Sequence, residues 1–137
     1  MMTTAALVVD RNRARRQRLT SELARRLGFA EGASSLSRAR RLMERCRFDC
    51  LVVDLDAGDG STLEWVSDLR QTSDQCSIIL TCDTDQAKQA ISALRFGVAE
   101  IMLRPFEPNS LLSAIQRVGG AGAAPPPSAV PGGIQPG

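Results

Sequence analysis

Three short apolar runs constrain the fold of this 137-residue chain more than any other feature. They read LVV, CLVV and SIIL, and they fall within predicted strands at Ala6–Val9, Cys50–Val53 and Ser77–Thr81. Each run is continuously apolar instead of alternating, which is typical of strands that are buried on both faces of a parallel sheet. A further strand is expected at Glu100–Leu103, and a weaker one near Ala30–Ser34.

Apolar residues at helical spacing predict five helices between and after these strands. In the first two helices, the residues expected on the inner face are Leu19, Leu23, Ala24 and Leu27 before Gly28, and Ala39, Leu42 and Met43 within Ser37–Cys46. In the third helix they are Leu63, Val66 and Leu69; this helix begins after Ser61, and Glu64 completes a capping-box spacing with that serine. In the last two helices they are Ala87, Ala90, Ile91 and Leu94, and Leu111, Leu112, Ile115 and Val118 after Pro108. Five βα units with short loops predict an α/β domain, with a doubly wound, five-stranded parallel sheet flanked by five helices.

This domain is predicted to span residues 1–118, and residues 119–137 are predicted to be a flexible tail or linker. The last segment, GGAGAAPPPSAVPGGIQPG, contains 15 Gly, Pro or Ala residues and shows no apolar period. Such a composition does not form a packed element. A linker at the end of a chain suggests that the domain is the front module of a longer protein.

The composition narrows the class of protein. No apolar run approaches the roughly 18 residues that a membrane span needs, and the N-terminus lacks a signal-peptide pattern, so a cytoplasmic protein is expected. The chain has no histidine, which removes Ser-His and Cys-His nucleophile chemistry. Its four cysteines lack zinc-site spacing and are expected to be reduced, buried or semi-buried thiols. They are Cys46, Cys50, Cys76 and Cys82.

Basic residues are concentrated in the first part of the chain. Residues 1–50 contain 12 Arg and 5 acidic residues, whereas residues 51–137 contain 5 Lys or Arg and 10 acidic residues. A solvated helix face and a surface for an acidic partner are both open interpretations of these arginines. No aromatic residues are interleaved with them for base stacking, so nucleic acid is not expected as a partner.

Polar side chains follow the predicted strands, at the edge where a doubly wound sheet forms its functional crevice. They are Asp10 and Arg11, Asp54 and Asp56, Thr81, and Arg104. Strand-end acids in one crevice can hold Mg²⁺ through oxygen ligands, so Asp10, Asp54 and Asp56 are candidate metal ligands. A carboxylate there can also act as a nucleophile toward phosphorus.

At these residues the chain resembles the receiver domains of two-component response regulators, which have the CheY-like, flavodoxin-like fold. "LVVDR" resembles the acidic first strand, "CLVVDLDAGDG" the third strand with its phosphoacceptor, "IILT" the fourth strand, and "IMLRPF" the Lys-Pro-Phe signature. The approach to the fifth strand, "ALRFGVAEIML", is also similar. The similarity covers about residues 5–118, with spacings of 44, 27 and 23 residues between Asp10, Asp54, Thr81 and Arg104. It implies a cis bond before Pro105.

The resemblance implies a signalling role. Asp54 would accept a phosphoryl group from a histidine kinase or a phosphotransfer protein, while Thr81 and Arg104 contact that group and Mg²⁺ neutralises its charge. The catalysis implied is at most the domain's own phosphorylation on Asp54. The other partners implied are an output domain or partner protein, with a homodimer as an open option; no membrane contact is implied.

Several residues depart from the family pattern. They are Arg11 in place of the second acid, Arg104 in place of the lysine, Ile101 in place of a rotating aromatic residue, Gly58 in place of a proline, and Thr62 in place of a glycine. A fixed cation at Arg11 removes a metal ligand and repels Mg²⁺. One hypothesis is that Arg11 and Arg104 pair with Asp54 from either side and hold one signalling state. The alternative is that Arg11 is the exposed start of a basic helix.

Three functions are compatible with these residues. The first is a receiver that is phosphorylated on Asp54. The second is a pseudo-receiver that works without phosphorylation, as an interaction or dimerisation module for an output domain. The third is a small-molecule binder of flavodoxin-like shape, which ranks last because no Gly-rich phosphate loop follows the first strand.

Overall fold

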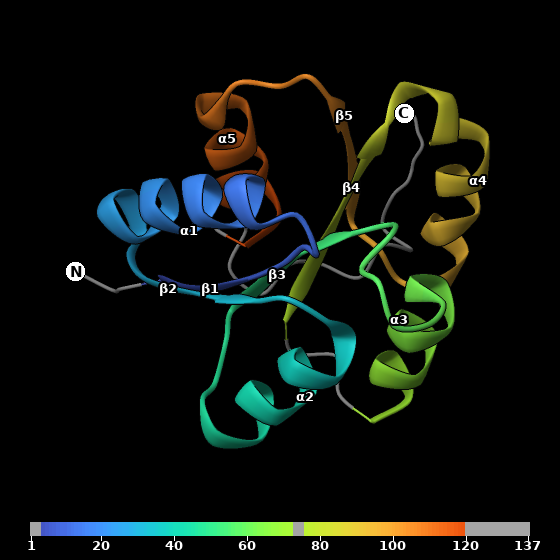
Figure 1. Ribbon diagram of the computed structural model, residues 1–137, viewed down its shortest axis with the longest axis horizontal. Helices are drawn as coiled ribbons and strands as arrows, with labels where there is room; N and C mark the ends of the chain where they lie inside the picture. The colour runs from blue at the N-terminus through green and yellow to red at the C-terminus, as the bar shows by residue number, and fades with distance from the viewer. Residues whose placement is uncertain (1–3, 73–75, 120–137) are drawn as a thin grey trace.

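The computed structural model describes residues 4–72 and 76–119. Five strands form one parallel sheet in the order β2-β1-β3-β4-β5 (Figure 1). The strands are β1 (Thr4–Val9), β2 (Gly28–Ala33), β3 (Cys50–Asp54), β4 (Ser77–Asp83) and β5 (Glu100–Arg104). The predicted doubly wound fold is confirmed, and β4 runs past its predicted end at Thr81 to Asp83.

Helices cover both faces of the sheet. They are α1 (Arg13–Leu27), α2 (Leu36–Arg45), α3 (Thr62–Thr72), α4 (Ala87–Ile91) and α5 (Pro108–Gly119), with 3₁₀ turns η1 (Thr84–Gln86) and η2 (Ser92–Phe96) on either side of α4. In Figure 1, α1 and α5 lie on one face of the sheet, and α2, α3 and α4 lie on the other.

The strands alternate their side chains between two buried apolar layers. Leu7 and Val9 of β1 belong to the layer beneath α2, α3 and α4, whereas Ala6 and Val8 belong to the layer beneath α1 and α5. All four side chains are at most 1% exposed. Burial on both faces explains why the run is continuously apolar.

The predicted ends of two helices are confirmed. Gly28 follows α1 with φ 110°, and its N–H donates to the carbonyl of Ala24, as expected for a glycine that ends a helix. Ser61 precedes α3, and its hydroxyl accepts a hydrogen bond from the Glu64 amide at 3.2 Å. This bond satisfies one of the amides left free at the helix start.

The predicted apolar face of the fourth helix is wrong in part. Ile91 and Leu94 are 60% and 51% exposed, whereas Ala90 and Ala93 are fully buried. The α-helix gives way to 3₁₀ winding at Ser92, and a three-residue turn brings Ala93 under Ala90. The tighter winding therefore turns Leu94 outward.

The thiol prediction holds for three of the four cysteines. Cys50, Cys76 and Cys82 are buried and free, and burial raises the pKa of Cys50 to about 12. Cys46 is also free but exposed, because it follows the last residue of α2. The predicted linker lies outside the described residues beyond Gly119, where α5 ends. Among the described residues, no helix is long and apolar enough to cross a membrane.

Candidate functional site

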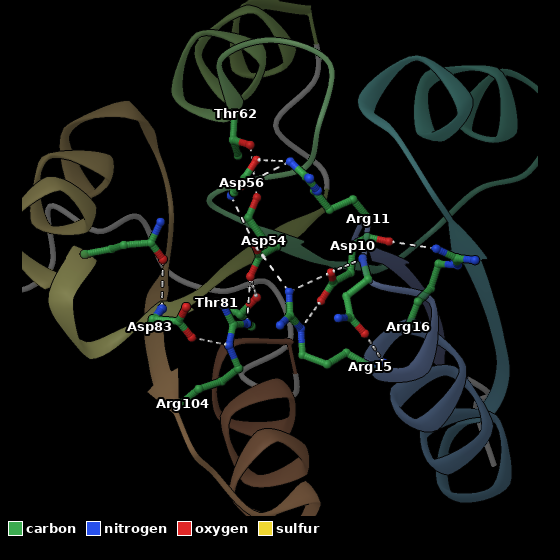
Figure 2. Close-up of polar contacts among 12 residues, drawn as sticks. Asp10, Arg11, Arg15, Arg16, Asp54, Asp56, Thr62, Thr81, Asp83 and Arg104 are labelled. Carbon is green, nitrogen blue, oxygen red and sulfur yellow. Dashed lines mark hydrogen bonds and ion pairs between the residues drawn. The ribbon is translucent and has the colours of Figure 1, made fainter.

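The carboxyl ends of β1, β3, β4 and β5 border one open crevice with a volume of about 520 Å³. All nine residues that line it are polar: Arg11, Asn12, Arg13, Arg15, Asp54, Asp56, Asp83, Gln86 and Arg104. Figure 2 shows several of these side chains converging from the ends of β3, β4 and β5, from α1 and from the loops beside them. The crevice lies at the edge of the sheet predicted to carry the function.

Asp54 is the centre of the crevice. It is the last residue of β3 and is 2% exposed. Its Oδ1 accepts hydrogen bonds from the Thr81 hydroxyl at 2.9 Å and from Arg104 Nη1 at 2.7 Å. Its Oδ2 accepts a bond from the Asp56 amide at 3.0 Å (Figure 2). The structure therefore brings together the three residues predicted to act on a phosphoryl group.

Arg104 joins Asp54 to the end of β4. Its Nε donates to Asp83 Oδ1 at 2.8 Å, while its Nη1 binds Asp54. Burial alone would lower the pKa of Arg104, but the hydrogen bonds to Asp83 and Asp54 outweigh it, so the pKa is raised. The same bond to Arg104 lowers the pKa of the Asp83 carboxyl. The bond between Arg104 and Pro105 is cis, as expected from the resemblance.

Asp10 is paired with Arg15. Asp10 directly follows β1, is 2% exposed, and accepts two hydrogen bonds from Arg15, from Nε at 2.9 Å and from Nη2 at 3.0 Å. Nη2 of Arg15 also lies 3.9 Å from Asp54 Oδ2. The hydrogen bond to Asp10 raises the pKa of Arg15 by more than burial lowers it. A guanidinium therefore lies between the two buried carboxylates (Figure 2).

The start of α1 explains why Arg15 reaches this place. Asn12 caps the helix: its side chain accepts a bond from the Arg15 amide at 2.9 Å. The Asn12 amide in turn donates to Asp10 Oδ1 at 2.8 Å. The cap therefore holds the first turn of α1 against the end of β1, with Arg15 on the side that faces the strand ends.

The hypothesis for Arg11 is wrong. Its Nη1 lies 3.3 Å from Asp56 Oδ1, and both side chains are more than half exposed, at 59% and 60%. Arg104 pairs with Asp54 as expected, but Arg15 occupies the other side of that carboxylate in place of Arg11. Arg11 precedes the helix, so its side chain extends along the rim of the crevice instead.

Each of the predicted magnesium ligands is paired with an arginine. Asp56 is exposed and contacts Arg11, while Arg15 lies between Asp10 and Asp54. Within residues 4–72 and 76–119, no three acidic or thiol side chains form a group that could hold a metal ion. The arrangement does not fit a divalent cation, because the cation position next to each carboxylate is already taken by a guanidinium.

Besides Arg15, three residues were not predicted in the roles that they have here. Thr62 donates its buried hydroxyl to the Asp54 carbonyl at 3.0 Å. Asp83 binds Arg104, and its position two residues after the predicted strand end at Thr81 is the signal that could have revealed it. Asp59 accepts bonds from the Leu36 and Ser37 amides at 2.7 and 3.1 Å, which fastens the β3–α3 loop to α2. Nothing in the local sequence indicates that last contact.

The fold and the site together define a doubly wound α/β domain of the receiver type, with an aspartate at the end of the third strand, a hydroxyl on the fourth, and a basic residue before a cis-proline on the fifth. The chain belongs to the family of response regulator receiver domains, whose model matches residues 6–116. Domains of this family act in two-component signalling, where they interact with histidine kinases and output domains.

The similar proteins are response regulators. The chain is 26% identical to the photosynthetic apparatus regulatory protein RegA of Rhodobacter capsulatus over 120 residues, covering 88% of this chain and 65% of RegA. It is 28% identical to the response regulator PilR of Pseudomonas aeruginosa over 107 residues, 78% of this chain and 24% of PilR. The chain thus spans less than two thirds of these relatives. A receiver domain structure from Clostridium thermocellum matches with a TM-score of 0.76 at 21% identity, covering 83% of this chain and 92% of that one.

Proposed function

We propose that Asp54 is the phosphoacceptor of this receiver in a two-component phosphorelay. The observation that carries this proposal is the double contact on Asp54 Oδ1, from Thr81 at 2.9 Å and from Arg104 at 2.7 Å. A hydroxyl and a guanidinium already point at the carboxylate to which a phosphoryl group would be attached. Both are hydrogen-bond donors that can stabilise the added negative charge.

In the proposed reaction, a carboxylate oxygen of Asp54 attacks the phosphorus of a phosphohistidine on a kinase or phosphotransfer protein. A bond from phosphorus to the Asp54 oxygen forms, the bond from phosphorus to the imidazole nitrogen breaks, and the imidazole leaves with the bonding electrons. Self-phosphorylation from a small phosphodonor is the only catalysis proposed. A cytoplasmic location, where such kinases present their phosphohistidine, is part of the proposal.

A second candidate function is a pseudo-receiver that serves an output domain, a partner protein or a second copy without phosphorylation. Exposed apolar side chains on neighbouring elements favour it: Ile91, Leu94, Phe96 and Leu103 of α4, η2 and β5. Apolar side chains gathered on one surface often mark a protein interface. The charge pairing of both buried aspartates also favours a domain that keeps one conformation.

Intact-mass spectrometry decides between the two functions. The domain is treated with acetyl phosphate, with and without Mg²⁺, beside an Asp54→Asn variant that has the same shape but no nucleophilic carboxylate. Trp65, which is partly buried on α3, reports the conformation by fluorescence. A phosphoryl mass gain that Asp54→Asn abolishes is the expected result. No mass gain and no fluorescence change with either acetyl phosphate or beryllofluoride would leave the pseudo-receiver as the function.

A further inference from the structure

We propose that the guanidinium of Arg15 takes the place of a divalent metal ion in this receiver. Two features then keep Mg²⁺ out of the crevice: the missing acid at position 11 and Arg15 itself. Because the crevice is the one around Asp54, this proposal rests on the receiver role given to that residue. The proposal adds one property to that role: the Arg15 side chain makes the unphosphorylated site independent of a metal ion.

The position of the guanidinium is the first argument. Arg15 contacts Asp10 at 2.9 and 3.0 Å and approaches Asp54 Oδ2 at 3.9 Å. That oxygen of Asp54 is the one that Arg104 and Thr81 leave free of side-chain donors, since both bind Oδ1. A metal ion that bridged Asp10 and Asp54 would have to occupy the same space as the Arg15 head group (Figure 2).

Charge balance is the second argument. The carboxylates of Asp10 and Asp54 are each 2% exposed, so they need positive partners close by. Arg15 and Arg104 supply two guanidiniums for these two carboxylates. The charges of these two carboxylates are thus already balanced. A divalent ion would be repelled by two fixed positive charges at short range, and it would find no unpaired carboxylate to bind.

The way Arg15 is held is the third argument. Asn12 accepts the Arg15 amide and donates its own amide to Asp10, so Asp10, Asn12 and Arg15 are linked through main chain and side chain alike. The neighbouring arginines do not reach both carboxylates. Arg11 has one exposed contact, to Asp56, and the Arg13 side chain makes no hydrogen bond or ion pair among the described residues. Arg16 donates from Nη1 to the main-chain carbonyl of Asp10 at 3.0 Å, not to a carboxylate. Arg15 is therefore the arginine that lies against the carboxylates of both Asp10 and Asp54.

Two separable features then oppose Mg²⁺, namely the lost acid at position 11 and the Arg15 cation. A matched set of variants separates them: Arg11→Asp, which restores the acid; Arg15→Gln, which keeps polarity and most of the length but removes the charge; and the double variant. Arg18→Gln is the control, since Arg18 is exposed on the same helix, lies outside the crevice, and its side chain makes no hydrogen bond or ion pair among the described residues.

The experiment is a Mg²⁺ titration of each full-length variant, followed by Trp65 fluorescence and by the shift of the thermal unfolding midpoint. Wild type and Arg18→Gln should show no saturable response at millimolar Mg²⁺. The double variant should bind, and Arg11→Asp alone should bind at least about tenfold more weakly, because Arg15 still occupies the position. A folded double variant, verified by circular dichroism, that does not bind Mg²⁺ would contradict the proposal.

Two other outcomes would also overturn it. If Arg11→Asp alone binds as tightly as the double variant, the missing acid is sufficient and Arg15 does not exclude the ion. If wild type already binds Mg²⁺ as tightly as the double variant, the position is not filled. Phosphoryl mass gain from acetyl phosphate is measured in parallel on the same samples. Its absence from every variant would remove the role proposed for Asp54, while the metal titration would still decide the role of Arg15.

Discussion

The guanidinium of Arg15 donates two hydrogen bonds to the carboxylate of Asp10, from Nε at 2.9 Å and from Nη2 at 3.0 Å. This paired geometry is the strongest form of contact between an arginine and a carboxylate. It connects α1 to the end of β1 beneath the crevice, so the site and the stability of the domain depend on the same side chain.

Removal of Arg15 should therefore destabilise the domain. Arg15→Ala leaves the buried carboxylate of Asp10 without its cation, and Arg15 is itself about one third exposed at 35%, so the expected loss is moderate. We expect the free energy of unfolding in urea to fall by about 1–3 kcal/mol. Arg18→Ala should cost less than about 0.5 kcal/mol. Equal losses for the two variants would show that the paired contact contributes nothing.

A lysine in place of Arg104 should not keep both of the contacts that Arg104 makes. Arg104 binds Asp54 through Nη1 and Asp83 through Nε, and a single ammonium group cannot reproduce that forked geometry. We expect Arg104→Lys to lower the free energy of unfolding by about 1 kcal/mol. A double-mutant cycle with Asp83→Asn checks the cause. In the lysine background Asp83→Asn should have a smaller effect, whereas an undiminished effect would mean that the lysine keeps the contact with Asp83.

A methyl group at Gly97 should disturb the turn before β5. Gly97 has φ 99°, and a Cβ there would lie 2.8 Å from Cγ and Nε of Arg70. Arg70 would have to move, although its Nε and Nη2 donate to the Gly97 carbonyl at 3.2 and 3.1 Å. Gly97→Ala should cost about 2–3 kcal/mol.

Gly60 provides the matched control for this substitution. It has φ 124°, and a Cβ at this position would meet no atom within 4 Å, so Gly60→Ala carries only the backbone strain, about 1–2 kcal/mol. Urea unfolding of both variants measures the difference. In an Arg70→Ala background the extra cost at Gly97 should disappear; if it persists, the contact with Arg70 is not its cause.

Asp59 should contribute stability that depends on pH. The Leu36 amide, followed by the Ser37 amide and hydroxyl, holds the pKa of the Asp59 carboxyl below its usual range. A lowered pKa means that the ionised carboxyl stabilises the folded state above the ordinary aspartate value, near pH ~4, and that this stabilisation is lost as pH falls through the lowered pKa.

Asp59→Asn should accordingly cost about 1 kcal/mol at pH 7, the usual loss for a helix-start contact. The cost should shrink as the pH falls below about 4, which urea unfolding from about pH 7 to about pH 3 would reveal. Asp85→Asn is the control, because Asp85 is exposed and its side chain makes no hydrogen bond or ion pair among the described residues. A cost at Asp59 that stays constant over this range would contradict the assignment.

Much of the site follows from the sequence because strand ends are local features. The runs before Asp54 and Thr81 are apolar and rich in β-branched residues, so they identify both the strands and the polar residues at their ends. A parallel sheet then brings these residues to one edge. The prediction of Asp54, Thr81 and Arg104 as neighbours was therefore correct, and hydrogen bonds join all three.

The sequence by itself determined the parallel sheet, the crevice at its carboxyl edge and the presence of surplus arginine beside Asp10, because each follows from short-range patterns of apolar and charged residues. Only the tertiary structure decided which arginine enters the site. Arg11 and Arg15 carry the same group, and no local pattern ranks them. The cap at Asn12 sets the phase of α1, and that phase turns Arg15 toward the two buried carboxylates and leaves Arg11 at the rim.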